Sequence, residues 1–540
     1  MLDARHADAV AVGVLATVAG VAAATFRDYG LGWDDLTHAQ YGQLLLDFYA
    51  SGFRDQRAFS FVNLYRYGGG FDMAAALLAK VLPFGLFETR RLLGAAVGLI
   101  GLAATWRLGR RMGGPLAGLL ALVLLAACPL YYGHMFMNPK DAPFAAMTAV
   151  ALLAAVRAFE DYPHPTPATV MLLGLGFGLS VGTRIMSGFA IMGALAALAL
   201  LVAAEARGQG LRHALGRLGH FLRAGLPAVV IAVAAMALVW PWAAMDVRNL
   251  PRALLYFSQF FEKPWHELFG GELILVTDMP RRYVPVLLGL KLPELTLALA
   301  VAGLGWAFVM VFRSGLPAHR RAALLCVALA GSLPVAVAVA TRPAVYNGIR
   351  HFLFILPPLA VLAGLAAGRL LERARQIGHA PVLAGVAVLA AGLALPIIEM
   401  VRLHPYQYVY FNHAAGGVRG ADGRYMLDYW GLAFRQASLD LLRRLAEEGL
   451  APEDGRKLRI AVCGPHPPAA IVLGERFELT WDPKGADFAM MLGAFYCRSF
   501  DAPVLVEVRR EGVVFARVYD IRGREFDSLF TIPPVRSDPQ

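Results

Sequence analysis

The sequence predicts a polytopic α-helical membrane protein of about eleven transmembrane helices, followed by a C-terminal α/β domain. The 540 residues are 58% hydrophobic and only 16% charged, and the mean hydropathy of +0.55 excludes a soluble protein of one or a few domains. Apolar runs of about 18 to 22 residues recur up to residue 401, and each could cross roughly 30 Å of hydrocarbon. Beyond that point short polar and apolar stretches alternate, which is typical of a small folded domain.

The apolar runs between charged gaps give the positions of the expected helices. The first run ends in VAAATF without an A-x-A cleavage site ahead of a soluble chain, so we expect an uncleaved first helix. The predicted helices lie near 8–26, 88–107, 114–132, 141–157, 166–184, 187–204, 222–243, 285–312, 322–341, 351–370 and 380–401.

The charged gaps predict the orientation. The net charge of +11 comes largely from Arg in short gaps between apolar runs, which is the pattern that orients membrane proteins and gives no reason to expect a nucleic-acid partner. With a cytoplasmic N-terminus, four of the five inner gaps carry two or more Arg; these gaps are 107–113, 157–165, 205–221, 313–321 and 371–379. The odd number of helices then places everything after about residue 402 outside.

One outward-facing surface would collect most of the polar residues of functional character. It receives the loops 27–87 and 244–284, the gaps 133–141 and 341–350, and the turn after Thr183. The ionisable residues expected there are Asp34, Asp35, His38, Arg66, Lys140, Asp141, Arg184, Arg350, His351 and His404.

The chain divides into a transmembrane part (1–401), an aromatic-rich connecting segment (402–435) and a C-terminal domain (436–540). The tail predicts one helix, SLDLLRRLAEEG, and the strands KLRIAVC, FELTW, DFAMML, PVLVEV and VVFARVY. It has no Gly-rich phosphate loop after a strand, so we interpret it as an accessory domain. Cys463 and Cys497 could pair if this domain lies outside the cytosol.

The stretch GWDDLTHAQYGQLLLDFY, residues 32–49, places two carboxylates directly after the first apolar run. If Asp34 begins a helix, Asp35 and His38 share a face three residues apart, and Gly42 leaves that face open. Two interpretations of Asp34 stay open. It is either a helix-capping residue or a carboxylate near the bilayer surface that accepts a proton from an attacking hydroxyl while its neighbour orients it.

The segment MNPKDAPF supplies a second polar group. Asp141 favours the start of the following helix through the helix dipole, and Lys140 offers a cation at the level of the lipid headgroups. Alone, Lys140 equally fits an interfacial lysine. Together with Arg184, Arg350 and His351 it predicts a phosphate clamp. A clamp at the hydrocarbon boundary suits a lipid phosphate, from which a group would pass to an acceptor hydroxyl or amine.

The order of these motifs resembles the GT-C membrane glycosyltransferases. The resemblance lies in WDDLTHAQYG, NPKDAPF, YNGIRHFLFILPPLA and the terminal α/β domain. The nearest group is glycosyltransferase family 39, with the protein O-mannosyltransferases and the aminoarabinose transferase of lipid A as relatives. This implies an inverting hexosyl- or pentosyltransferase of a bacterial inner membrane, with a periplasmic C-terminal domain and a polyprenyl-phosphate-linked sugar as donor. Its acceptor could be a glycan, a lipid or a protein.

The resemblance also implies roles for residues. Asp34 would be the general base, and two further acids would be catalytic: Asp35, which stands where the family more often has Glu, and Asp141, which matches an acidic residue at the start of the fourth helix. The donor phosphate would be bound by Lys140, Arg184, Arg350, His351 and, more loosely matched, Arg66. Substrate contacts are expected from His38, Asn138, Tyr346, His404 and Tyr406; for the segment 404–431, an interfacial aromatic belt is the alternative.

Two further alternatives remain open. Asp35, His38 and Asp141 could hold a divalent metal, although a histidine three residues from an acid more often makes a local hydrogen bond, and no cofactor is required with certainty. The rival function is a transporter or flippase of lipid-linked sugars. A transporter favours ionisable residues near the middle of the bilayer and internal repeats, and the sequence has few of the former and no clear repeat.

Overall fold

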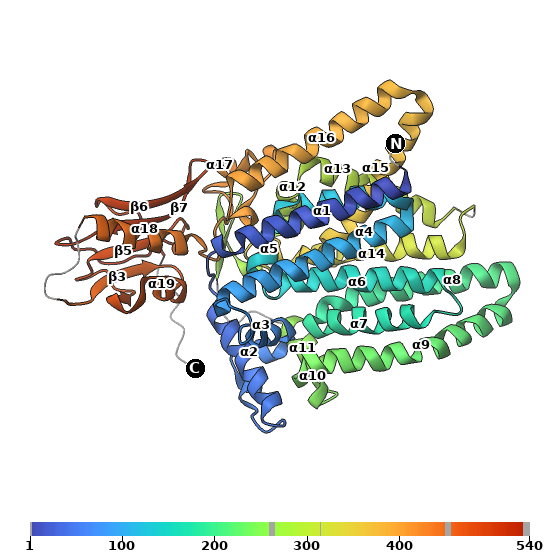
Figure 1. The fold of residues 1–540 in the computed structure, drawn as a ribbon, viewed down its shortest axis with the longest axis horizontal. Coiled ribbons are helices and arrows are strands. Elements are labelled where there is room, and N and C mark those ends of the chain that lie inside the picture. Colours follow the sequence, from blue (N-terminus) through green and yellow to red (C-terminus); the bar gives the residue numbers. More distant parts are fainter. Residues whose placement is uncertain (1–2, 259–264, 314, 449–454, 533–540) are drawn as a thin grey trace.

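The computed structural model describes residues 3–258, 265–313, 315–448 and 455–532. It consists of a helical bundle with a strand-containing C-terminal domain at one end, while the N-terminus lies at the opposite end (Figure 1). Within the described residues nine helices are long and apolar enough to cross a membrane. The predicted fold class, a polytopic helical membrane protein with a C-terminal α/β domain, is confirmed. The parts of loop 244–284 and of the tail that fall in 259–264, 449–454 and 533–540 lie outside the described residues.

The N-terminal half of the bundle contains a tight helical hairpin within one long helix. Its elements are α1 (Ala4–Thr25), α2 (Asp35–Ala50), α3 (Gly70–Leu78), α4 (Leu86–Ala126) and α5 (Pro129–Met137). The chain leaves helical geometry at Gly114, where φ is 82°, and Pro115 follows. A Cβ atom on Gly118 would lie 2.8 Å from the Cβ of Arg110, so the two halves of α4 run back against each other. This turn explains why a 41-residue helix matches two predicted spans.

The remaining helices follow the predicted runs with two breaks, one at Trp240 in the run 222–243 and one at Leu292 and Pro293 in the run 285–312. They are α6 (Asp141–Glu160), α7 (Pro167–Thr183), α8 (Gly188–Gln209), α9 (Leu211–Val239), α10 (Pro241–Met245), α11 (Asn249–Ser258), α12 (Tyr283–Lys291), α13 (Glu294–Val311), α14 (Ala318–Thr341), α15 (Leu356–Ile377) and α16 (His379–Arg402). The single helix predicted over 285–312 is wrong. Leu292 is extended, because a proline disfavours helical geometry in the residue before it. Helix α13 begins after Pro293.

The core of the bundle forms around α15. Helices α4 and α13 pack along it, and α6 lies against α4 and α7. The apolar stretches of α9 and α16 are almost entirely exposed on the outside of the bundle, which is expected of helices that face lipid. Because successive helices alternate in direction, the loops predicted to share one surface emerge at the end of the bundle beside the C-terminal domain (Figure 1).

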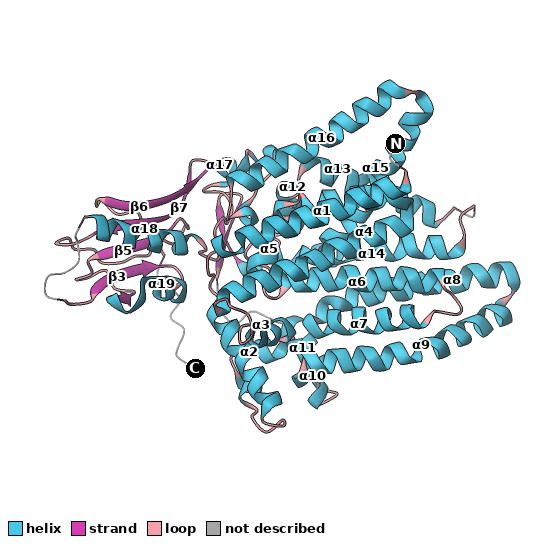
Figure 2. Ribbon diagram, in the orientation of Figure 1, coloured by secondary structure: helices cyan, strands magenta, loops and turns pink. Residues whose placement is uncertain are grey.

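The C-terminal domain is a mixed five-stranded sheet with helices. Figure 2 shows its strands apart from the helical bundle. Its elements are α18 (Ala433–Glu447), β3 (Leu458–Cys463), α19 (His466–Leu473), β4 (Phe477–Thr480), β5 (Phe488–Leu492), β6 (Val504–Arg510) and β7 (Val513–Asp520). The strand order is β4-β3-β5-β7-β6, with β3 parallel to β4 and β5, and β7 antiparallel to β5 and β6. All five predicted strands are present, and Cys463 forms a disulfide with Cys497.

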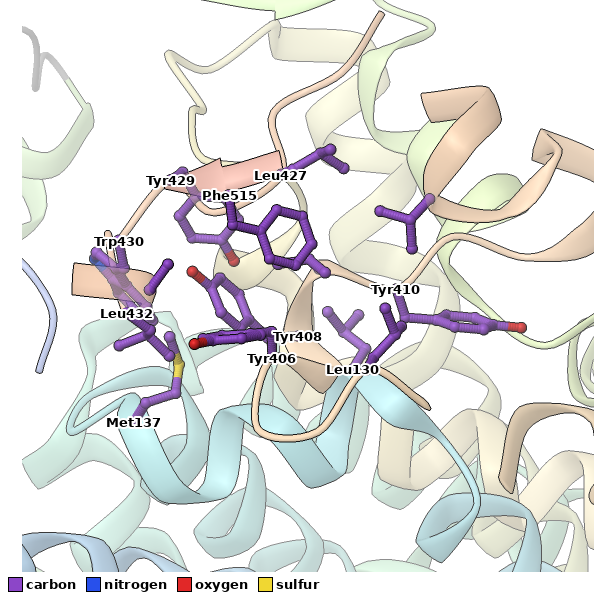
Figure 3. Close-up of a cluster of buried hydrophobic side chains, with 14 of the residues drawn as sticks. Leu130, Met137, Tyr406, Tyr408, Tyr410, Leu427, Tyr429, Trp430, Leu432 and Phe515 are labelled. Atoms are coloured by element: carbon purple, nitrogen blue, oxygen red, sulfur yellow. The ribbon is translucent and has the colours of Figure 1, made fainter. Parts of the chain in front are cut away.

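An aromatic cluster joins the bundle to this domain. Tyr406, Tyr408 and Tyr410 of the connecting segment are buried, and they lie near Leu130 of α5 and Phe515 of β7 (Figure 3). These rings pack inside the protein, so the alternative of an interfacial aromatic belt is wrong for them. The cluster fixes the domain against the loops that carry the polar residues.

Candidate functional site

Asp34 lies at the start of α2, where its carboxylate is free of helix capping. Its backbone carbonyl accepts from the amide of His38, but within the described residues its side chain makes no capping hydrogen bond. The capping interpretation of Asp34 is therefore wrong. The side chain is 41% exposed, and its Oδ2 lies 3.8 Å from Nζ of Lys140. The carboxylate thus faces the end of the bundle beside a cation.

The charges around Asp34 keep it ionised. Burial would raise the pKa of its carboxyl, but the positive charge of Lys140, with smaller contributions from His38 and Arg350, lowers the pKa below its usual value. Burial also lowers the pKa of Lys140, an effect that Asp34 opposes. The two groups form an ion pair whose members stabilise each other's charge.

Asp35 is buried and engaged on both oxygens. Arg91 Nη1 donates to its Oδ1 at 2.9 Å and Nη2 to its Oδ2 at 2.6 Å, while the amide of Gly32 donates to Oδ2 at 2.7 Å. The same Nη2 also donates to the carbonyl of Gly30. This bidentate pair ties the loop that carries Asp34 and Asp35, here called the acidic loop, to the start of α4. A carboxylate held in this way is not free to react, so the catalytic role predicted for Asp35 is replaced by a positioning role.

His38 belongs to a second buried network. Its Nδ1 lies 2.5 Å from Oδ2 of Asp72, and Arg90 donates to Oδ1 of Asp72 at 2.7 Å. The Nε2 of His38 is buried and has no hydrogen-bond partner in the described part of the chain. Gly42 is required here, since a Cβ on it would lie 2.3 Å from the carbonyl oxygen of Asp72.

The predicted metal set does not come together. Asp35 is paired with Arg91 and His38 with Asp72, while Asp141 belongs to a separate group. Across residues 3–258, 265–313, 315–448 and 455–532, no group of three or more His, Cys, Asp or Glu side chains could hold a metal ion.

Asp141 holds two of the predicted phosphate-binding arginines. Its Oδ1 lies 2.7 Å from Arg184 and its Oδ2 lies 3.4 Å from Arg350. Asn138 donates to the same carboxylate at 2.9 Å. Because two guanidinium groups and an amide surround this buried carboxylate, it cannot accept a substrate proton readily. We therefore replace the catalytic role predicted for Asp141 by that of an anchor for the cations.

The cations retain unused hydrogen-bond donors. Both Arg184 Nε and Arg350 Nε are buried and lack a partner among the described residues. Three cations, Lys140, Arg184 and Arg350, face two carboxylates, Asp34 and Asp141, which leaves one positive charge. A buried donor without a partner is costly, so the site favours an anionic ligand.

Aromatic rings enclose the cation cluster. Lys140 Nζ lies 5.0 Å and Arg184 Cζ 5.4 Å from the ring centre of Tyr67. Arg350 Cζ lies 5.1 Å from Tyr346 and 5.2 Å from Trp430. His351, whose ring contacts Tyr346 at 5.3 Å, completes this side. Tyr346 and His351 were predicted, whereas Tyr67 and Trp430 were missed.

Three predicted site residues make other contacts. Arg66 stacks on Tyr256 at 3.7 Å and is the chain neighbour of Tyr67 in the cation cluster, and its contact with the donor phosphate stays a prediction. His404 lies 2.9 Å from Asp28. Tyr406 donates to Gln436 at 3.0 Å within the domain junction. The substrate contacts predicted for His404 and Tyr406 therefore do not fit, because these side chains are used to join parts of the chain.

The connecting segment packs against the acidic loop. The amide of Trp33 donates to the carbonyl of Trp430 at 3.2 Å, and a Cβ on Gly30 would lie 2.2 Å from the carbonyl oxygen of Leu432. Tyr429 lies 3.2 Å from Nε2 of His134, which in turn contacts Asn138. Residues close to the C-terminal domain thus complete a site that begins near the N-terminus.

Comparison with known proteins gives a family match over part of the chain. Residues 71–242 match the family of dolichyl-phosphate-mannose-protein mannosyltransferases. The match includes Lys140, Asp141 and Arg184, whereas Asp34 and Arg350 lie outside it. It confirms the resemblance to GT-C glycosyltransferases predicted from the sequence. No curated protein sequence matches the chain significantly.

Solved structures with a similar arrangement include proteins from Archaeoglobus fulgidus and Cupriavidus metallidurans. The apo Archaeoglobus fulgidus oligosaccharyltransferase is 12% identical, with a TM-score of 0.49; the match covers 88% of this chain and 65% of that protein. ArnT from Cupriavidus metallidurans bound to undecaprenyl phosphate is 15% identical, with a TM-score of 0.48 and coverage of 94% and 97%. The Archaeoglobus fulgidus oligosaccharyltransferase AglB, in complex with an inhibitory peptide and a dolichol-phosphate, is 11% identical, with a TM-score of 0.47 and coverage of 89% and 69%. This chain therefore spans just under two thirds of the length of the apo archaeal protein.

Proposed function

We propose that this chain is an inverting membrane glycosyltransferase that moves a sugar from a polyprenyl-phosphate donor to an acceptor, with Asp34 as the general base. The observation that carries the proposal is the ionised, accessible carboxylate of Asp34 beside a cation group with unused donors. A base and a phosphate-binding group side by side are what a single displacement at an anomeric carbon requires.

The reaction would proceed in one step. Asp34 takes the proton of the acceptor hydroxyl as its oxygen forms a bond to the anomeric carbon, and the bond from that carbon to the phosphate oxygen breaks. The electron pair leaves with the lipid phosphate, which gains a second negative charge. Lys140, Arg184 and Arg350 would stabilise that charge, and they do so more strongly in the transition state than in the donor complex.

Donor binding would also tune the base. In the unliganded site Lys140 lowers the pKa of Asp34, which makes the carboxylate a weak base. A donor phosphate bound to Lys140 adds negative charge nearby and competes for the same cation, so the pKa of Asp34 rises. Asp34 therefore becomes a stronger base only when the donor is present, which limits proton abstraction in its absence.

The remaining buried ion pairs would fix the positions of the cations and of the turn that carries Asp34. Asp141 holds Arg184 and Arg350 at a fixed separation, and Arg91 holds Asp35 and with it the turn before α2. A small misplacement of a base relative to the anomeric carbon lowers the rate strongly, so rigid support is part of catalysis. A divalent metal is not needed in this scheme, since the described acids near Asp34 already pair with arginines.

The proposed location is the periplasmic face of a bacterial inner membrane. The Arg-rich gaps lie at the opposite ends of the helices from the site, which favours an outward-facing site. The disulfide between Cys463 and Cys497 supports the same side, because disulfides persist in oxidising compartments. The transporter alternative is less well supported, because the charges of the site gather at helix ends at one end of the bundle.

The decisive test is the substitution Asp34→Asn. The chain is expressed in a strain lacking it, and transfer from the polyprenyl-phosphate sugar is followed in isolated membranes. We expect at least a hundredfold loss of transfer with normal expression, consistent with the removal of a general base. Asp47→Asn is the matched control, since Asp47 lies on the same helix and pairs with the exposed Arg57. Full transfer by Asp34→Asn would contradict the proposal.

A further inference from the structure

A cleft separates the connecting segment from the sheet of the C-terminal domain. Its volume is about 460 Å³, and it runs between residues 422–429 and the ends of β5, β6 and β7. Met491 pairs with Arg517 across β5 and β7, so both side chains lie on one face of the sheet. Helix α18 packs on the opposite face through Ser438 and Met490. The cleft therefore lies on the face of the sheet that α18 leaves uncovered.

The sheet wall of the cleft is rich in arginine. Arg509 and Arg517 share one acid, Glu507, at 2.5 Å and 2.7 Å. Arg498 is exposed at the rim, and its side chain makes no hydrogen bond or ion pair within the described ranges. Glu507 neutralises only one of the three guanidinium groups. Such a wall can bind a carboxylate or phosphate, and Arg498 can do so in bidentate fashion.

The rest of the lining offers aromatic rings and a single exposed acid. Tyr425 and Phe495 line the cleft, and Asp422 faces it from the connecting segment. Asp428 also borders the cleft, but its carboxylate accepts from the amides of Leu432 and Ala433. Rings that stack on sugar faces, an acid that accepts from hydroxyl groups and free guanidinium groups together suit a saccharide that carries an acidic group. The volume falls in the range of about 300–1,000 Å³ typical of small-molecule sites.

One wall of this cleft is also part of the candidate active site. Tyr429 lines the cleft and contacts His134, which contacts Asn138 beside Asp141. The next residue, Trp430, stacks on Arg350 and accepts from Trp33 in the acidic loop. An occupant of the cleft would therefore be separated from Asp34 and the cations by Tyr429 and Trp430.

We propose that this cleft binds the acceptor, and that the acceptor is an anionic saccharide bearing carboxylate or phosphate groups. The identity of the occupant as acceptor rests on the proposed glycosyl transfer. The acidic groups contact Arg498 and Arg517, the sugar rings lie between Tyr425 and Phe495, and this part of the acceptor is anchored beside Tyr429, outside the group that carries Asp34. The arginines select the charge of the acceptor, while the reaction itself takes place at Asp34.

Binding to the purified full chain tests the cleft directly, with the protein in detergent for the soluble sugars and in nanodiscs for the vesicles. The probes are tetragalacturonate, neutral maltotetraose, and phosphatidylcholine vesicles with or without monophosphoryl lipid A. We expect tetragalacturonate or the lipid A vesicles to bind in a salt-dependent manner and maltotetraose to bind at least tenfold more weakly. Binding of tetragalacturonate indicates a soluble glycan as source, and binding only of the doped vesicles indicates a glycolipid. Failure of both acidic probes to bind would overturn the proposal.

Variants separate this proposal from the proposed function. Arg498→Ala should weaken acidic-probe binding about tenfold and raise the acceptor KM, with kcat and the donor KM unchanged. Arg443→Ala is the control, because Arg443 is 69% exposed and pairs with Asp440 on α18. Asp34→Asn should bind the acidic probe as well as the unchanged protein does, although it transfers no sugar. Unaltered binding by Arg498→Ala would refute the cleft while leaving the role of Asp34 standing.

Discussion

Breaking the ion pair between Arg91 and Asp35 should destabilise the protein and disable the site without touching a reacting atom. Arg91→Ala removes two charge-assisted hydrogen bonds to Asp35, at 2.9 Å and 2.6 Å, and one to the carbonyl of Gly30 at 2.6 Å. The Asp35 side chain is 4% exposed, so its charge would be left buried with one hydrogen bond, from the amide of Gly32, and with the Nε of Arg90 3.9 Å away. Loss of one member of a buried pair costs about 3–5 kcal/mol, and we expect a decrease of that size in the free energy of unfolding.

The measurement is equilibrium unfolding of the purified protein in mixed detergent micelles, with transfer activity followed in parallel. The matched control is Arg57→Ala, whose ion pair with Asp55 is equally short at 2.6 Å but has a 67% exposed arginine. It should cost less than about 1 kcal/mol. The double variant Asp35→Asn with Arg91→Gln restores a neutral hydrogen-bonded pair, and we expect it to regain at least half of the lost stability together with measurable transfer.

Two results would refute this reasoning. The first is an unchanged free energy of unfolding in Arg91→Ala, which would mean that Asp35 is solvated or paired differently. The second is a double variant that is stable but wholly inactive, since this outcome would assign the chemistry to the carboxylate of Asp35 itself rather than to the position that it holds.

Three further predictions concern the base, the packing of α2 and the orientation. Lys140→Ala removes the charge that lowers the pKa of Asp34, so that pKa rises; because the ionised form reacts, the acid limb of the pH profile of kcat/KM should move to higher pH, whereas Lys140→Arg should leave it in place. Gly42→Ala places a Cβ 2.3 Å from a carbonyl oxygen of α3 and should cost about 1–3 kcal/mol in thermal unfolding, whereas Gly13→Ala, which meets nothing within 4 Å, should cost nothing measurable. A cysteine at the exposed Arg54 should react with an impermeant maleimide from outside intact spheroplasts, and labelling only after lysis would reverse the proposed orientation.

The sequence predicted the helices and the side of the bundle on which polar residues gather. Apolar length identifies a span, and alternation of direction then decides which loops share an end. These two rules were enough to bring Asp34, Lys140, Arg184 and Arg350 into one group. The break at Pro293 was missed because the run on both sides of it is apolar, and hydropathy does not report backbone geometry.

The pairings inside the site could not be predicted in the same way. Asp35 and Arg91 are separated by 56 residues, and the sequence does not specify which of two adjacent carboxylates turns toward the protein. The pair of arginines in ETRRLLG was the available signal, since two charges at the outer start of a span need buried partners. His404 and Tyr406 were misassigned because presence on the outer side does not determine which neighbour a side chain contacts.

The hydrogen bond from Trp33 to Trp430 also has a consequence for synthesis of the protein. The loop that carries Asp34 enters the membrane early, whereas the segment that holds this loop in place emerges only after the last transmembrane helix. A nascent chain therefore carries Asp34, Lys140, Arg184 and Arg350 before it can position them. The cluster can reach its full arrangement only when translation has passed residue 430.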